Sequence, residues 1–369
     1  MKKILARSRS LNPPARRLRS TAVALLALLL SAATLPAPAS AAGELDPSFG
    51  TGGFVMTDLG GYETADYAAV QPDGRIVVVG GAAQGTGPSL LADVSLLRYR
   101  ADGALDTAFG NGGKVILDFG NTADVPTGVC LQADGKIIVV GTSYSPTTEA
   151  DDLVLARFNA DGTPDASYGT GGRVKVNLKA PLPAYTVTAL IQPDGRVIAA
   201  GVVYTSNDPQ PFESNFFATR INADGTLDTT FGTQGRATVD IMGFDIVTGI
   251  ALQADGRILL AGMAGVSPNT GPTPTFFALA RLKADGTPDP TFDGDGRLTT
   301  TFFGRDFANG VAVQADGKLV VAGETSRAFP NSTEPDFALA RYETNGVLDL
   351  TFGTEGRLTL DFDFGADTA

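Results

Sequence analysis

Arginine and aspartate recur at fixed places in this chain and are its most regular candidates for chemistry. Each arginine lies near the end of a short apolar stretch, and each aspartate precedes an aromatic residue by three positions. The arginines are Arg98, Arg157, Arg220, Arg281 and Arg341, and the aspartates are Asp46, Asp106, Asp165, Asp228, Asp289 and Asp349. A ring of arginines could bind an anionic ligand, but a buried guanidinium also needs a partner, which a carboxylate supplies in bidentate geometry. We interpret both series as structural and keep the ligand ring as the alternative.

One stretch, in which aspartate and glycine alternate, suggests a calcium site. It reads Phe292-Asp293-Gly294-Asp295-Gly296-Arg297 where most other copies read Phe-Gly-Thr-x-Gly. Carboxylate and carbonyl oxygens are the ligands that calcium prefers. The spacing of an EF-hand, with its closing glutamate, is not found here. The favoured interpretation is a solvated turn without a cofactor, and calcium, with Asp289, Asp293 and Asp295 as its candidate ligands, is the alternative.

Several kinds of catalytic site are excluded by composition. The chain has no histidine and one cysteine, so histidine-based triads and histidine-ligated zinc are ruled out. Cys130 occupies a position that alanine or leucine takes in the other repeats, which predicts a buried apolar residue rather than a reactive thiol.

A carboxylate-dependent, glycosidase-like enzyme stays open as an alternative, because glycoside hydrolysis needs only two placed acids. Six acids lie on the variable segments: Glu149, Asp151, Asp208, Glu213, Glu324 and Glu334. Since the chain has 40 acidic residues, chance pairs are common. The favoured interpretation therefore assigns no catalytic residue.

These residues are positioned by a repeat with a period of 60 or 61 residues. Its clearest segment is Gln71-Pro72-Asp73-Gly74-Arg75 followed by apolar residues and Gly80. The same segment begins again at Gln132, Gln192, Gln253 and Gln314. A constant period of this length indicates a repeat architecture.

Each repeat predicts about four antiparallel strands. Apolar runs flank an Asp-Gly turn, which is a hairpin signal, and we expect a primed turn there. The second run, for example Ile76–Val79 or Leu319–Ala322, is apolar throughout, which predicts burial on both faces. The arginine strand, a second turn and a short closing strand follow. Four strands in about 60 residues predict one propeller blade.

The chain resembles the delta-60 repeat, a bacterial β-propeller repeat of unknown function, with a looser likeness to NHL-type propellers. The resemblance rests on Ala-Leu-Ala-Arg-Tyr with Asn-Gly or Asp-Gly, Leu-Asp-x-x-Phe-Gly-x-x-Gly-Arg, and Gln-Ala-Asp-Gly-Lys before an apolar run. It covers nearly everything after Leu45. It implies an all-β propeller in an exported or surface context and brings no known catalytic residues.

Five blades are expected, with a surplus segment. The hairpin and the arginine strand occur five times, but Leu-Asp-x-x-Phe-Gly and its variants occur six times. The chain stops where the pattern predicts another hairpin, so we expect either a truncated chain or a ring that is open or carries part of an extra blade. An open ring would expose strand edges.

The long loops on one face are the predicted binding surface. Both Asp-Gly turns of a blade fall on one face, here called the turn face, and the dissimilar longer loops fall on the other, the loop face. The candidate ligand-binding residues are the loop aromatics Tyr144, Tyr204, Phe212 and Phe329. Binding commonly resides in loops on a rigid scaffold, although neutral insertions remain the alternative.

The first 41 residues are predicted to be a secretory signal peptide. Seven basic residues precede an apolar run from Ala22 to Leu30, and small residues follow at Ala39–Ala41. The run is shorter than the roughly 18 residues of a membrane span. We therefore expect a propeller domain over residues 44–369 that is secreted, periplasmic or on the cell surface.

The charge of the chain bears on its partners. A formal net charge of −12 argues against nucleic acid, and no membrane insertion of the mature chain is expected. The predicted function is a non-catalytic scaffold that binds an extracellular protein or glycan. A glycosidase-like enzyme and a calcium-binding structural surface protein are the alternatives.

Overall fold

The structure is a computed structural model, and its described residues are 44–83, 92–120, 124–145, 150–177, 184–204, 213–266, 274–326 and 335–361. The expected signal peptide, residues 1–41, lies outside them. The described residues form β-strands and turns with no α-helix. None of them therefore belongs to a helix long and apolar enough to cross a membrane.

The strands form five antiparallel blades, one for each repeat. Blade one holds β1 (Tyr62–Glu63), β2 (Tyr67–Val70), β3 (Ile76–Ala83), β4 (Ala92–Tyr99) and β5 (Lys114–Leu117). Blade two holds β6 (Asp124–Leu131), β7 (Ile137–Ser145), β8 (Ala150–Phe158) and β9 (Arg173–Asn177). Blade three holds β10 (Ala184–Ile191), β11 (Val197–Tyr204), β12 (Ser214–Ile221) and β13 (Arg236–Val239). Blade four holds β14 (Phe244–Leu252), β15 (Ile258–Gly265), β16 (Thr275–Leu282) and β17 (Arg297–Thr300). Blade five holds β18 (Arg305–Val313), β19 (Leu319–Ser326), β20 (Asp336–Tyr342) and β21 (Arg357–Leu360).

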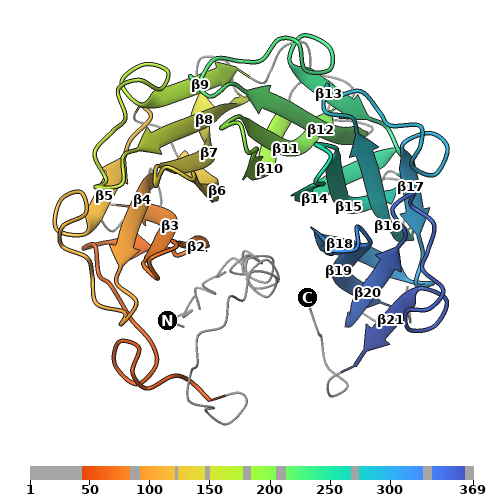
Figure 1. Ribbon diagram of the computed structural model, residues 1–369, viewed down its shortest axis with the longest axis horizontal. Helices are drawn as coiled ribbons and strands as arrows, with labels where there is room; N and C mark the ends of the chain where they lie inside the picture. Colours follow the sequence, from red (N-terminus) through yellow and green to blue (C-terminus); the bar gives the residue numbers. More distant parts are fainter. Residues whose placement is uncertain are drawn as a thin grey trace, which may run out of the picture.

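The blades stand side by side in an open arc (Figure 1). β2, β6, β10, β14 and β18 lie toward the middle of the arc, and β5, β9, β13, β17 and β21 lie outside. In blades two to five, neighbouring strands pair in sequence order, whereas in blade one β1 and β2 both pair with β3 and together take the place of one inner strand. A single parallel bridge between Ser214 and Phe244 links blades three and four. The predicted all-β propeller of five four-stranded blades is confirmed. In the described part of the chain, no strand pairs blade five with blade one.

The innermost strand of each blade is irregular at the same place. Register shifts occur in β6, β10, β14 and β18, and the interval between β1 and β2 takes their place in blade one. The irregular backbone lies very close to the glycine that ends each apolar run. A Cβ at Gly141 would lie 2.6 Å from the carbonyl oxygen of Val125. Only glycine allows this approach, which explains why each run ends in that residue.

The hairpin turns differ from the primed turn that we expected. Gly74 has φ 84°, but Asp73 is not among the described residues with positive φ. The Gly74 amide donates to the carbonyl of Gln71 at 2.9 Å, and the Asp73 carboxylate accepts from the Arg75 amide at 3.0 Å. This arrangement fits a type I turn followed by a left-handed glycine. The aspartate is needed for its side-chain hydrogen bond rather than for its φ.

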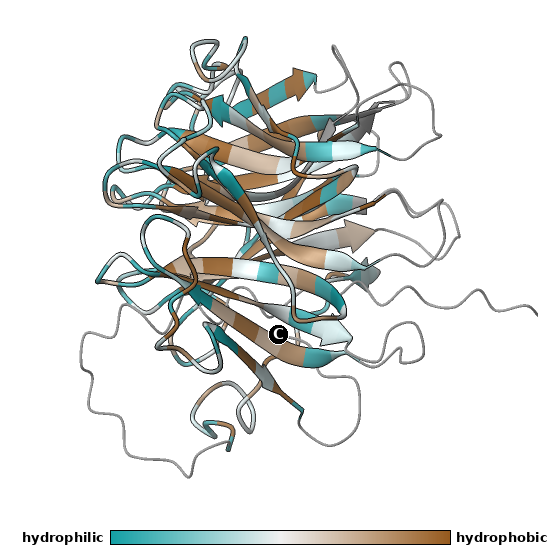
Figure 2. Cartoon of the chain, turned by 90° about the vertical axis from the view of Figure 1, so that its right-hand side faces the viewer, coloured by the Kyte–Doolittle hydropathy of each residue, from teal (hydrophilic) through white to brown (hydrophobic). Residues whose placement is uncertain are grey.

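The hydrophobic core lies between blades. We call the sheet face turned to the following blade the trailing face and the opposite one the leading face. Between blades four and five, Leu259, Phe277 and Phe292 of the trailing face pack with Leu319 and Tyr342 of the leading face, and all five are 0% exposed. Figure 2 shows apolar residues along the strands and hydrophilic ones in turns and strand ends.

The two terminal blades depart from the prediction that the apolar strands are buried on both faces. In β7, β11 and β15 the predicted segments are buried throughout. In β3, however, Ile76 and Val78 are partly exposed, and in β19 Val320 is partly exposed. The prediction is therefore wrong for the leading face of blade one and the trailing face of blade five, because no described blade covers either one.

Candidate functional site on the loop face

The repeated arginines and aspartates pair on the turn face of each blade. Nε of the arginine donates to Oδ2 of the aspartate eight residues later. The distance is 2.8 Å for Arg98–Asp106, Arg157–Asp165, Arg220–Asp228 and Arg281–Asp289, and 2.7 Å for Arg341–Asp349. Each guanidinium carbon also lies 4.4 to 4.8 Å from the centre of the aromatic ring that follows its aspartate. The pair thus fixes the aromatic residue on the trailing face.

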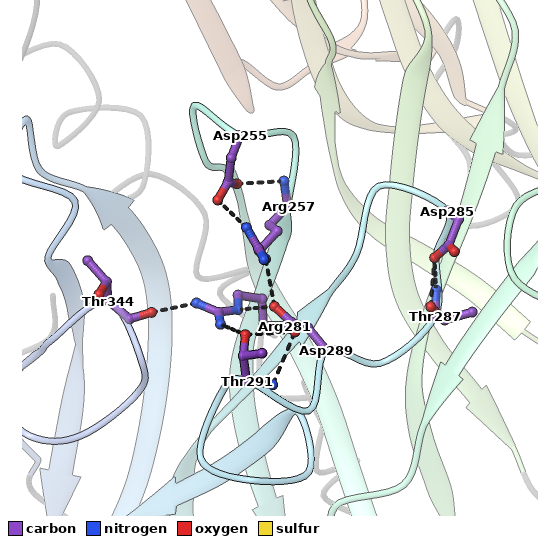
Figure 3. A network of polar contacts seen from close by, with 8 residues as sticks. All are labelled: Asp255, Arg257, Arg281, Asp285, Thr287, Asp289, Thr291 and Thr344. Atoms are coloured by element: carbon purple, nitrogen blue, oxygen red, sulfur yellow. Dashed lines mark hydrogen bonds and ion pairs between the residues drawn. The ribbon is translucent and has the colours of Figure 1, made fainter.

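A second cation reaches the same carboxylate. It comes from the hairpin turn of the same blade, as Figure 3 shows for Arg257, Arg281 and Asp289. Arg257 Nε lies 2.7 Å and Arg281 Nε 2.8 Å from Asp289 Oδ2. The matching turn residues are Arg75, Lys136, Arg196 and Lys318. Sequence reasoning missed this role, although a basic residue after Asp-Gly in every hairpin was the signal.

These pairs also link one blade to the next. Nη1 of the arginine donates to a backbone carbonyl in the turn of the following blade, at 2.7 Å for Arg157 to Ala223. The other bonds run from Arg98 to Ala160, Arg220 to Ala284 and Arg281 to Thr344. The guanidiniums of blades one to four are therefore engaged by protein atoms.

The predicted metal ligands do not act as one group in this arrangement. The Asp289 carboxylate accepts from Arg257, Arg281 and Thr291, and these partners hold its pKa at about 2 despite its burial. Asp295 lies 3.0 Å from Arg297 Nε, and burial raises the pKa of Asp293. The group that the structure does bring together as candidate metal ligands lies elsewhere.

The predicted aromatic ligands lie at the margin of the described residues. Tyr204 ends β11 and is half-buried. Tyr144 lies near the end of β7, and its side chain is not among those described. Phe212 and Phe329 lie outside the described residues.

Three aspartates meet on the loop face at the junction of blades one and two. Asp93 lies near the start of β4, Asp118 follows β5, and Asp124 begins β6. One carboxylate oxygen from each lies within 4.8 Å of the others. Burial, followed by the charges of Asp118 and Asp124, raises the pKa of Asp93. Clustered carboxylates of this kind are ligands for a hard divalent cation. The sequence motifs gave no signal for this group, because its members lie in different segments of the repeat.

Asp124 also belongs to a set of buried aspartates that begin inner strands. Asp245 and Asp306 take the same place in blades four and five, and all three are at most 1% exposed. Asp245 accepts from the amides of Ile241 at 2.7 Å and Met242 at 3.1 Å. Burial raises the pKa of Asp245 to about 7. A carboxyl group with a raised pKa can act as a general acid, but this one is 0% exposed and ties down the loop that enters β14.

The two faces therefore differ in what repeats. On the turn face the arginine and the aspartate recur in every blade. On the loop face, the position of Asp93 is taken by Asp152, Asn215, Phe276 and Asp336 in the later blades. The position of Asp118 is taken by Asn177, Asp240, Thr301 and Asp361. The loop face thus varies among the blades and is rich in carboxylates, with aspartate at both positions in blades one and five and at neither position in blade four.

Of the six acids considered for glycosidase chemistry, two have described side chains. Glu213 is exposed and Glu324 is half-buried.

Solved structures of low sequence identity share parts of this architecture. A levansucrase mutant of B. megaterium matches with a TM-score of 0.39 and 13% identity, over 76% of this chain and 82% of that one. A GH43 endo-arabinanase of Bacillus licheniformis matches with a TM-score of 0.37 and 11% identity, over 76% and 94% of the two chains. At this level of similarity they carry no argument about activity. No curated protein sequence matches the chain.

A family match covers all five repeats. It spans residues 71–109, 132–168, 192–231, 253–292 and 314–352, each from the hairpin glutamine to the aromatic residue of the closing segment. The resemblance to a delta-60-like repeat propeller is confirmed. The chain belongs to the family described as a domain of unknown function (DUF5122) β-propeller.

Proposed function

We propose that this protein is an exported, non-catalytic scaffold whose loop face binds an extracellular protein or glycan. The observation that carries the proposal is the contrast between the faces. The turn face uses its repeated charges to join the blades, whereas the loop-face positions of Asp93 and Asp118 hold different residues in blades two, three and four. Rigid repeats that present dissimilar residues on one surface are well suited to recognition.

The acidic character of the loop face restricts the chemical classes of partner that it can bind. Asp93, Asp118 and Asp124 concentrate negative charge at one junction. A protein surface rich in lysine or arginine, or a glycan that carries amino groups, complements it. Nucleic acid and anionic lipid do not complement this face, because they carry negative charge themselves.

The test presents the purified chain to a glycan array and to extracellular proteins. A variant with Asp93→Asn and Asp118→Asn should lose binding, and more so at low salt, where charge contributes most. Asp134→Asn is the matched control, because Asp134 is an exposed aspartate in a hairpin turn. Equal binding by the double variant and the wild type would contradict the loop-face site. Turnover of any offered polysaccharide would contradict the non-catalytic assignment and favour the glycosidase-like alternative.

A second candidate function is calcium binding at the same three aspartates. It is favoured by the carboxylate oxygens within 4.8 Å of one another. Isothermal titration with CaCl₂ should then give one site, which the double variant loses and Asp134→Asn keeps. A calcium response that is unchanged in the double variant, or absent in the wild type, would reject this candidate.

A further inference from the structure

The contact between successive blades is built in the same way at every junction. The Gly110 amide of blade one donates to the carbonyl of Asp161 in blade two at 2.8 Å. Equivalent bonds join Gly169 to Asp224, Gly232 to Asp285 and Asp293 to Asn345. The aromatic residue just before each donor is covered by the turn of the next blade. Phe109, Tyr168, Phe231 and Phe292 are therefore all 0% exposed.

The trailing face of blade five carries equivalent apolar residues, but no described blade packs against it. Its apolar side chains are Val320, Phe337, Leu339, Phe352 and Leu358, and all are partly exposed. Their counterparts in blade four are Leu259, Phe277, Leu279, Phe292 and Leu298, which are at most 7% exposed. The Arg341 side chain is 24% exposed, against 6% for that of Arg281. Within the described residues this face therefore lacks the partner that every other trailing face has.

The leading face of blade one is covered only in part. Residues 45–58, here called the cap segment, contain the sixth copy of the Leu-Asp-x-x-Phe-Gly motif and lie where the outer strand of a preceding blade would lie. The Gly50 amide donates to the carbonyl of Asp102 at 2.8 Å, and the Tyr99 hydroxyl donates to Thr57 Oγ1 at 2.7 Å.

Among the described residues, the rest of that face is not covered by the strands of a full blade. Ile76 and Val78 remain partly exposed, whereas the matching Leu319 and Val321 of blade five are 0% exposed. Phe54 and Met56 of the cap segment are 53% and 87% exposed and pair with no described strand.

We propose that the trailing face of blade five docks the leading face of blade one of a second copy of this chain. The two faces are the halves of a contact that the chain already forms four times, so the complementarity is built into the repeat. Residues 348–360 of one copy would take the place of the cap segment of the other, since both hold the same motif. The cap segment is then a competitor within the chain that weakens this association.

The geometry of the internal junctions specifies the new bonds. The Gly353 amide would donate to the carbonyl of Asp102 in the second copy, and Arg341 Nη1 would donate to the carbonyl of Ala101. Phe352 would lie under the turn at Gly103. Because the two faces differ, the contact is head-to-tail and produces rings or open chains rather than a two-fold dimer.

The test uses two variants that each retain one working face. Phe352→Asp places a charge on the trailing face, and Ile76→Asp places one on the leading face. The wild type should associate with increasing concentration in sedimentation velocity, whereas each variant alone should associate about 30-fold more weakly, the effect of a hot-spot residue. An equimolar mixture of the two variants should form a 1:1 dimer, because one intact trailing face and one intact leading face remain. Leu350→Asp is the control, since Leu350 is 72% exposed and its counterparts stay exposed at the four internal junctions, namely Thr107, Ala166, Thr229 and Pro290.

Changes in the cap segment give an independent readout. Thr57→Ala removes its hydrogen bond with Tyr99 and should strengthen association of the otherwise unchanged chain. Circular dichroism of every variant establishes that it is folded. A wild type that stays monomeric at all concentrations would overturn the proposal, as would a dimer that Phe352→Asp abolishes while Ile76→Asp leaves it intact. The latter result would indicate a tail-to-tail contact.

Discussion

Arg157 and Ala223 belong to neighbouring blades, and a hydrogen bond of 2.7 Å joins Nη1 of the arginine to the carbonyl oxygen of the alanine. The same guanidinium binds Asp165 in its own blade and lies over the ring of Tyr168. One side chain thus fixes the carboxylate, the aromatic residue and the next blade. This explains why the arginine recurs at a constant place while the loops around it change.

Arg157→Ala should lower the free energy of unfolding by about 3 kcal/mol, because it leaves the buried Asp165 carboxylate with one partner fewer. Urea denaturation followed by circular dichroism measures the change. Arg341→Ala is the matched control. Its side chain is 24% exposed, against 7% for Arg157, and it contacts no following blade in the described part of the chain. Its loss should be clearly smaller, and equal losses would show that the link between blades contributes nothing.

Tyr168→Phe should raise the free energy of unfolding by about 1 kcal/mol. The Tyr168 hydroxyl is fully buried and has no hydrogen-bond partner among the described atoms, and the other covered copies of this position are phenylalanine. Tyr342→Phe is the control, because its buried hydroxyl donates to Thr300 Oγ1 at 2.8 Å. That variant should lose stability. Thermal unfolding of both proteins tests the opposite signs.

Cys130 should be unreactive in the folded protein. It is 7% exposed and packs in the core between blades two and three, and burial raises the pKa of its thiol to about 12. Ellman's reagent at pH 8 should therefore label it only after urea is added. Cys130→Ala serves as the blank for the assay. Rapid labelling without urea would show that this junction opens readily.

The fold was largely predictable from the sequence because it depends on local and repeated signals. The Asp-Gly turns, the apolar runs and the constant period specify a four-stranded unit, and five copies specify a propeller. Asp93, Asp118 and Asp124 were not predictable as a group, because their proximity depends on how one blade packs against the next. The second cation at Asp289 was missed for a related reason. Arg257 lies 32 residues away, and only the folded hairpin brings it to the carboxylate.

The exposure of the leading face of blade one and of the trailing face of blade five could not be predicted from the sequence pattern either. Val320 and Leu259 occupy the same position in their repeats, so a pattern within one repeat predicts equal burial. The difference arises from the neighbour that each blade has. Leu259 packs against residues of blade five, whereas no described blade follows the one that holds Val320.

Stability should fall as the pH drops below about 4, because the paired aspartates hold their protons more weakly when folded. The partners of Asp289 lower its pKa from 3.8 to about 2. A lowered pKa in the folded state stabilises the protein above the unfolded value, and this contribution is lost as the pH falls from about 4 to about 2. Thr291→Val removes a hydrogen bond of 2.8 Å to Asp289 and should shift the loss to higher pH. Urea titrations at several pH values measure it, and an unchanged profile would contradict the assignment.

The titration of Asp245 should lower the free energy of unfolding as the pH rises, which is opposite to the effect of Asp289. Burial raises its pKa from 3.8 to about 7, so the folded protein holds a proton that the unfolded chain releases. The free energy of unfolding should therefore decrease as the pH rises from about 4 to about 7 and become level above that range. Asp245→Asn cannot titrate and should flatten this slope between pH 5 and pH 7. Asp316→Asn, a change at an exposed turn aspartate, should leave the slope unchanged. A slope that persists in Asp245→Asn would assign the titration to another group.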